Sequence, residues 1–403
     1  MTKVTVRAEV SSYELASLDL PVEIHDLDLH VVARGTVREQ FTLPRGTYIA
    51  RSPMPGGQIL GASFEVVDEE PVDVTLRPAP GEASPEEVQE RARFVWGLDP
   101  ALASEGGKGG AAEAAARHGL RAFEWSEQSG TYFVAKESLS DAWIGAIGSV
   151  VRMRMPYHHP LRLLSVEQPG DTRQNIVLPP LERSSGPDVY EIVLASEHDG
   201  TVDATAHLTD GNADLMLQYG GRGLLREAAS MADEVADDAV ANLAERLLYH
   251  KLRSPLSAAA GAYVLLRMGR LDQLHDWTEN LYNWVEWLPD GAIIRAEHLA
   301  REGDHEEAAE RLLALKERGL PIFSDGLSYA INLLDQYTVS AAHNVRHRAW
   351  ELRDRLLPVA AVTDFTKSFT TYLAPDPNDP VARSARATHE PAGYEPKPEH
   401  GYA

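Results

Sequence analysis

The sequence predicts a multi-domain α+β protein, in which one or more N-terminal β-sandwich domains are followed by an all-α helical-repeat domain. Short segments of alternating apolar and polar residues, typical of strands, occupy the chain up to about residue 210. From Gly223 onward the apolar residues instead recur with the period of a helix. In the C-terminal half, small and apolar residues also repeat every 34 positions.

The composition is that of an ordinary globular chain, with 43% hydrophobic and 25% charged residues among 403. The 61 acidic residues outnumber 38 basic ones, and the net charge of -23 disfavours nucleic acids and anionic membranes as partners. Cysteine is absent, which excludes disulfides and cysteine-based metal sites. Because residues 1–20 lack a signal-peptide core and no apolar stretch reaches about 18 residues, we expect a cytoplasmic protein.

Residues 1–80 are expected to form a first β-sandwich. Residues 4–10 alternate, and further candidate strands lie at 21–25, 30–34, 40–43, 62–67 and 72–76. The segment 43–51, Leu-Pro-Arg-Gly-Thr-Tyr-Ile-Ala-Arg, contains a turn that leads into a strand and places one aromatic ring, Tyr48, toward a core. This segment and the regular strand spacing resemble the prealbumin-like, carboxypeptidase-regulatory-like sandwiches that occur as accessory domains.

A linker with a short helix is expected over residues 81–119. Ser84 and Pro85 suit the start of a helix, and Glu87 completes a capping box. Residues 120–210 then predict a second β-rich domain, a sandwich or a partly open barrel. Its candidate strands are 132–135, 147–155, 161–166, 175–178 and 189–194.

Residues 222–360 are expected to be helical. Apolar residues from Leu224 to Leu247 fall on one helical face, which allows one long helix, and a second helix start follows at Ser254 and Pro255. Residues 375–403 contain six prolines and no apolar period, so we expect a disordered tail.

The repeat aligns four kinds of position at the 34-residue spacing. These are Ala262, Ala296 and Ala330; Leu265, Leu299 and Leu333; Gly269 and Gly303, with Tyr337 in the next copy; and Leu274, Ala308 and Ala342. The middle copy is the most regular, with Gly303 as a turn residue and Asp304 and Glu307 as a capping pair. Residues 255–357 therefore resemble tetratricopeptide repeats.

The resemblance implies a concave face, lined by the first helix of each repeat, that grips an extended peptide. The partner-binding groove would then contain Tyr263, Leu266, Arg267, Glu297, Arg301, Ile331 and Leu334. Because this set is mostly apolar, something must cover it: a partner segment, the protein's own β domains or a neighbouring helix. Trp277, Trp284 and Trp287 share a helical face, which is typical of core residues; the alternative is an interface hot spot.

These features favour a non-enzymatic adaptor or scaffold that binds another protein or peptide, in a bacterial assembly of regulatory or defence type. We expect no catalytic residues, no metal and no cofactor. Two alternatives stay open. One is a β-sandwich that binds carbohydrate or a small ligand through Tyr132, Phe133, Trp143 and Tyr157. The other is a metal-dependent hydrolase that uses His158 and His159. His343 and His347 also have metal-ligand spacing, but Asn344 stands where a metalloprotease would need its glutamate base.

Overall fold

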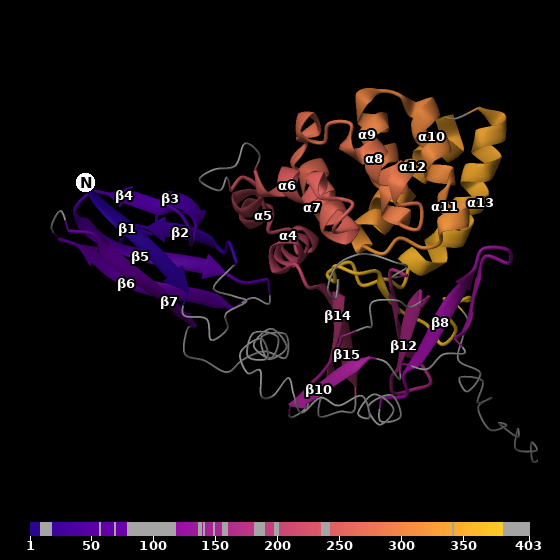
Figure 1. The fold of residues 1–403 in the computed structure, drawn as a ribbon, viewed down its shortest axis with the longest axis horizontal. Coiled ribbons are helices and arrows are strands. Elements are labelled where there is room, and N and C mark those ends of the chain that lie inside the picture. Colours follow the sequence, from indigo (N-terminus) through magenta and orange to yellow (C-terminus); the bar gives the residue numbers. More distant parts are fainter. Residues whose placement is uncertain are drawn as a thin grey trace, which may run out of the picture.

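In a computed structural model of the chain, the described residues are 1–8, 18–55, 58–67, 70–78, 118–135, 139, 142–147, 150–154, 160–180, 190–196, 201–234, 242–340 and 342–381. Sheets occupy the described chain up to residue 208, and helices follow from residue 211 to 360, so the expected α+β organisation is confirmed. In Figure 1, strands β1–β7 form one body, and the helices lie beside it and above the remaining strands.

The first β region contains seven strands joined in the order β3-β2-β5-β6-β7-β1-β4. The strands are β1 (Thr2–Ala8), β2 (Pro21–His25), β3 (Val31–Thr36), β4 (Gln40–Leu43), β5 (Gly46–Pro53), β6 (Ile59–Val66) and β7 (Val72–Pro78). Alternation places Val4, Val6 and Ile24 in the core, each fully buried. Tyr48 is 6% exposed, as expected of a core-facing ring, and its hydroxyl donates to the carbonyl of Pro44 (3.0 Å).

The second β region forms two sheets, in the orders β10-β11-β14-β15 and β16-β13-β12-β8-β9. The strands are β8 (Arg121–Ser126), β9 (Thr131–Val134), β10 (Trp143–Ile147), β11 (Val150–Arg154), β12 (Leu163–Glu167), β13 (Arg173–Val177), β14 (Tyr190–Ser196), β15 (Val202–Leu208) and β16 (Thr371–Leu373). Strand β16 follows the helices in the chain and pairs with β13. The C-terminal segment therefore completes a sheet whose other strands come before the helices.

The helical region begins earlier than residue 222. Its elements are α4 (Gly211–Gly221), α5 (Leu225–Ala232), α6 (Leu243–Tyr249), α7 (Pro255–Met268), η3 (Leu271–Gln273), α8 (Trp277–Trp284), α9 (Pro289–Glu302), α10 (His305–Leu313), α11 (Leu315–Arg318), α12 (Ser324–Ser340) and α13 (His343–Ala360). The expectation of one long helix over residues 224–247 was wrong. Helix α5 ends at Ala232, and α6 begins with its own capping box between Asn242 and Glu245.

The three repeated alanines, Ala262, Ala296 and Ala330, lie on α7, α9 and α12 and are fully buried. Helix α9 packs against both α7 and α12. Gly269 (φ 71°) and Gly303 (φ 93°) end α7 and α9 in the left-handed conformation that favours glycine. At the third position Tyr337 stays inside α12, because a tyrosine does not readily adopt that conformation.

The first residues of the tail expected from Pro375 are part of the described fold. Asn378 accepts the N–H of Tyr132 (2.6 Å) and donates to the carbonyl of the same residue (2.9 Å), which anchors the segment up to residue 381 on β9. The remainder of the predicted tail, and the predicted linker up to residue 117, lie outside the described residues. Among the helices of the described chain, none is both long and apolar enough to cross a membrane.

Candidate functional site

The apolar members of the predicted groove lie inside the helical region. Tyr263, Leu266 and Leu334 are fully buried, and Ile331 is partly buried. The hydroxyl of Tyr263 donates to Asp290 Oδ1 (2.8 Å), and its ring stacks on that of Tyr329 at a centroid distance of 6.0 Å. The protein's own helices therefore cover most of the apolar part of this face.

The charged members of the groove pair with each other or with neighbours. Arg267 forms two hydrogen bonds to the Asp325 carboxylate, one of them from Nε to Oδ2 (2.9 Å). Arg301 Nε donates to Glu297 Oε1 (2.7 Å), and the Arg301 guanidinium lies 5.7 Å from the Tyr329 ring centroid. Binding of a partner at these residues stays a prediction, and it would require these contacts to open.

A different surface of the helical region exposes large side chains. Tyr249 is 61% exposed, Leu252 is 64% exposed and Trp284 is 57% exposed. The ring of Trp277, which is partly buried, lies 5.4 Å from Tyr249 in an edge-to-face arrangement. We call these four residues, together with Lys251, the aromatic patch. Exposed tryptophan and tyrosine are enriched at the energetic centres of protein interfaces.

Lys251 is the unusual member of the aromatic patch. Only 5% exposed, it has its ammonium group 5.4 Å from the Trp277 ring and 5.7 Å from the Trp284 ring. Burial lowers the pKa of Lys251, and the more distant negative charge of Asp276 partly offsets this effect. Among the described residues no ion pair of Lys251 is found, and the two indole rings make cation–π contacts with its ammonium group.

Two short helices hold the aromatic patch in place. Helix α6 ends at Tyr249, and the following turn carries Lys251 and Leu252. His275 has a left-handed backbone conformation (φ 49°). Its Nε2 lies 3.1 Å from Glu245 Oε1, and this contact connects the start of α8 to α6. The buried face of α8 is formed by Thr278 and Leu281, which turns the Trp277 and Trp284 side of the helix outward.

Sequence reasoning identified the tryptophans but favoured a core role for them. Trp284 is exposed, whereas Trp277 and Trp287 are only partly buried. The seven-residue spacing of Trp277 and Trp284 was the available signal for this surface. Tyr249, Lys251 and Leu252 were missed, because neither the last residue of α6 nor the turn that follows it belongs to a periodic pattern.

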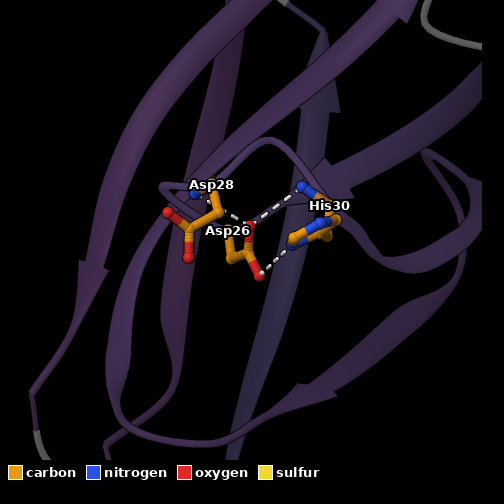
Figure 2. A group of neighbouring side chains, drawn as sticks. All are labelled: Asp26, Asp28 and His30. Carbon is orange, nitrogen blue, oxygen red and sulfur yellow. Dashed lines mark hydrogen bonds and ion pairs between the residues drawn. The ribbon is translucent and has the colours of Figure 1, made fainter.

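The β2–β3 hairpin brings Asp26, Asp28 and His30 together (Figure 2), with potential ligand atoms within 4.8 Å of one another. Asp26 Oδ1 accepts the backbone N–H groups of Asp28 (3.0 Å) and His30 (2.9 Å). Those bonds are the contacts of an ordinary turn, in which an aspartate caps its own loop. The cluster therefore has a complete structural explanation.

A polar cavity of about 600 Å³ lies between the second β region and the segment that follows α13. Its main polar groups already have partners in the protein. Gln174 Nε2 donates to the carbonyl of Ala204 (3.0 Å), and the Lys367 ammonium pairs with the Asp203 carboxylate. These contacts join the β region to the C-terminal segment.

Thr205, at the edge of this cavity, begins a series of a hydroxyl, an imidazole and a carboxylate. Its Oγ1 lies 2.8 Å from His207 Nε2, and His207 Nδ1 lies 3.3 Å from Oδ2 of the buried Asp214. Asp214 also accepts the N–H of Leu208 (2.9 Å), so it connects α4 to β15. The order of groups is that of a nucleophile, a base and an orienting acid.

The other candidates from the sequence are dispersed. His158, His159 and Tyr157 lie outside the described residues, as do the side chains of Trp143 and His343. His347 Nε2 lies 3.3 Å from Glu351 Oε1 on an exposed face. Tyr132 is 7% exposed and packs edge-to-face on Trp125 at 5.0 Å, which makes it a core residue, whereas Phe133 is 42% exposed.

Two comparisons with known proteins give matches to parts of the chain. The Y4kD C-terminal domain family matches residues 215–397, a range that begins within α4 and includes β16. A curated protein of a Desulfuromonadales bacterium, described as a probable protease, is 34% identical over 96 residues. The aligned part is 24% of this chain and 12% of that protein, so the chain spans only a small part of this relative's length.

Proposed function

We propose that this protein is a non-enzymatic adaptor that binds another polypeptide through the aromatic patch of its helical region. The observation that carries the proposal is the group of exposed Tyr249, Leu252 and Trp284 around the buried Lys251. Exposed aromatic and aliphatic side chains on a rigid helical support are the usual anchors of a protein interface.

The architecture proposed for the helical region is a short tetratricopeptide-like array. Its hairpins would be α9 with α10 and α12 with α13, whereas α7 packs against α6 and not against α8. The equivalent burial of Ala262, Ala296 and Ala330 on successive first helices supports this, as do the glycine ends of α7 and α9. The seven-stranded region would be a prealbumin-like sandwich that serves as an accessory domain.

The chemistry of the aromatic patch indicates the kind of partner. Indole and phenol rings favour an apolar anchor, and the Lys251 ammonium favours a carboxylate within the same partner segment. A carboxylate placed at Lys251 would form an ion pair in a setting already shielded from water, where such a pair is stronger than at an open surface. The proposed ligand is therefore a polypeptide segment with an acidic side chain beside an aliphatic or aromatic one.

The relative described as a probable protease bears only on the modular organisation of the chain. The similarity covers 12% of that protein, a share suited to one module of a larger chain. In this proposal the adaptor acts in a bacterial assembly of regulatory or defence type.

The test uses tagged full-length chain with a matched pair of variants. Trp284→Ala removes an anchor of the aromatic patch, whereas Trp350→Ala removes a tryptophan of nearly equal exposure, 56%, on α13. Quantitative mass spectrometry should find a protein that co-purifies with the unchanged chain and with Trp350→Ala but is lost with Trp284→Ala. Binding must then be reproduced with the two purified proteins; a partner retained equally by both variants contradicts the proposal.

A second candidate function is hydrolysis by the Thr205–His207–Asp214 series, favoured by its position at the polar cavity. In that case Thr205 Oγ1 would attack a substrate carbonyl while His207 Nε2 accepts its proton. That proton would pass to the leaving group as its bond to the acyl carbon breaks, and water would then release the acyl group from Thr205. A fluorescent casein assay discriminates the two functions. Activity abolished by both Thr205→Val and His207→Ala supports hydrolysis, and activity absent from the unchanged chain removes it.

A further inference from the structure

The seven-stranded region meets the helical region through a small set of polar contacts. The N–H of Asp19, just before β2, donates to Asn212 Oδ1 (3.0 Å), and Asn212 Nδ2 donates back to Asp19 Oδ2 (2.8 Å). Farther along α4, the hydroxyl of Tyr219 donates to the carbonyl of Pro53 (2.8 Å). Arg222 also donates to the carbonyl of Pro55. Among the described residues these polar contacts are few, so a buried charge at this interface affects the association of the two parts.

Two carboxyl groups face each other inside the interface. Asp19 comes from the seven-stranded region and is 1% exposed; Glu234 follows α5 and is 8% exposed. Their side chains lie within hydrogen-bonding range of each other, and Glu234 Oε2 is buried without a hydrogen-bond partner. Two ionised carboxylates repel at this range, whereas a proton on one of them converts the contact into a hydrogen bond.

The nearby cations determine which group holds the proton. Arg38 Nε lies 2.5 Å from Asp19 Oδ1, and Arg246 on α6 adds a more distant positive charge. Burial raises the pKa of Asp19, and Arg38 opposes that rise and so favours the ionised form of Asp19. Burial, followed by the negative charge of Asp19, raises the pKa of Glu234 to about 7 despite both arginines.

We propose that Asp19 and Glu234 share one proton at this interface, and that loss of the proton releases the seven-stranded region from the helical region. The docked arrangement binds one proton more than the separated one. Its population therefore falls as the pH rises through the range in which Glu234 ionises. The shared proton thus stabilises the docked arrangement of the two parts, independently of what the aromatic patch binds.

The experiment measures the distance between the two parts by pulsed electron paramagnetic resonance. Because the chain has no cysteine, spin labels can be placed selectively at Arg45→Cys and Asn332→Cys, both at exposed positions. We expect a narrow distance distribution at pH 5.5 and a broad one at pH 8.5. With Glu234→Gln, which keeps a donor toward Asp19 but cannot ionise, the distribution should stay narrow at both pH values.

Glu227→Gln on α5 is the matched control. Its distance distribution should broaden as the pH rises, as that of the unchanged chain does. A distribution that is the same at both pH values in the unchanged chain would overturn the proposal, as would a Glu234→Gln chain that still broadens at pH 8.5. If circular dichroism shows that Glu234→Gln fails to fold, the deciding measurement is the titration of the Glu234 carboxyl in the unchanged chain, followed by carbon NMR with labelled glutamate. A titration midpoint of the Glu234 carboxyl near pH 7 supports the shared proton, and a midpoint at the ordinary glutamate value overturns it.

Discussion

Asp290 lies at the first turn of α9 without any contact to solvent. Its Oδ1 accepts the hydroxyl of Tyr263 (2.8 Å), and its Oδ2 accepts the N–H of Ile322 (2.8 Å). This carboxylate therefore joins α7, α9 and the segment before α12. Tyr263, expected in a partner-binding groove, contributes to the internal bonding of the helical region.

Asp290→Asn should destabilise the protein by about 2–3 kcal/mol, because one of the two accepting oxygens becomes a donor that faces another donor. Tyr263→Phe is the milder comparison: it removes one hydrogen bond and should cost about 1 kcal/mol. Urea unfolding at pH 7 measures both changes. Equal stability of Asp290→Asn and the unchanged chain would contradict this description of the site.

The pH dependence of stability follows from the same residue. Burial raises the pKa of Asp290 to about 6, so the folded chain holds a proton that the unfolded chain has already lost. Stability should therefore fall as the pH rises from about 4 to about 6 and level off above, by about 3 kcal/mol from this group. Urea unfolding across this range should give a smaller decline for Asp290→Asn. Asp290→Asn is needed as the reference because Glu234 titrates over an overlapping pH range.

At the scale of elements, α6 and α7 approach closely at Gly261. A Cβ at this position would lie 2.7 Å from the Ala244 carbonyl oxygen and 3.2 Å from Leu247 Cβ. A backbone atom cannot move aside without displacing α6, the helix that ends at Tyr249. Glycine at this position thus determines where the aromatic patch lies.

Gly261→Ala should lower stability by about 1–3 kcal/mol, because an added methyl group must push α6 away from α7. Gly220→Ala on α4 is the control, since its Cβ would meet nothing closer than 3.6 Å. That control should be neutral or slightly stabilising, as alanine favours a helix over glycine. Thermal unfolding of both variants tests the pair; similar melting temperatures for the two would contradict the close packing.

Local patterns predicted most elements of the fold. Strands β2 and β4 match the expected bounds, and the glycine ends of α7 and α9 follow from Gly269 and Gly303. Helix α4 and strand β16 were missed. Helix α4 is buried on nearly all sides and has no polar stripe, and β16 has only three residues and depends on pairing with β13. The aromatic patch was missed in part, because exposure of Trp284 is decided by the packing of α8 and not by its sequence spacing.

At the scale of the whole molecule, the segment after α13 joins the helices to the second β region. Thr370 donates its N–H to the Ile322 carbonyl (2.7 Å), and its own carbonyl accepts the N–H of Val177 (3.0 Å). Strand β16 then pairs with β13. The helical region and this β region should therefore unfold together.

A chain that ends at residue 366 should lose this joint unfolding and melt at a lower temperature, because β13 loses its neighbour and the helices lose their contacts with Thr370. A chain that ends at residue 381 keeps every described residue and should melt like the full chain. Differential scanning calorimetry distinguishes the cases. A single transition at an unchanged temperature for the shorter chain would contradict the coupling.

The most direct test of the adaptor function is the affinity of the purified protein for its purified partner, measured by isothermal titration calorimetry. Trp284→Ala should weaken binding by at least about 30-fold, as expected for loss of about 2 kcal/mol at an interface anchor. Trp350→Ala should leave the affinity within about 3-fold, which is less than 1 kcal/mol. Unchanged affinity for Trp284→Ala, with the fold intact, would contradict docking at the aromatic patch.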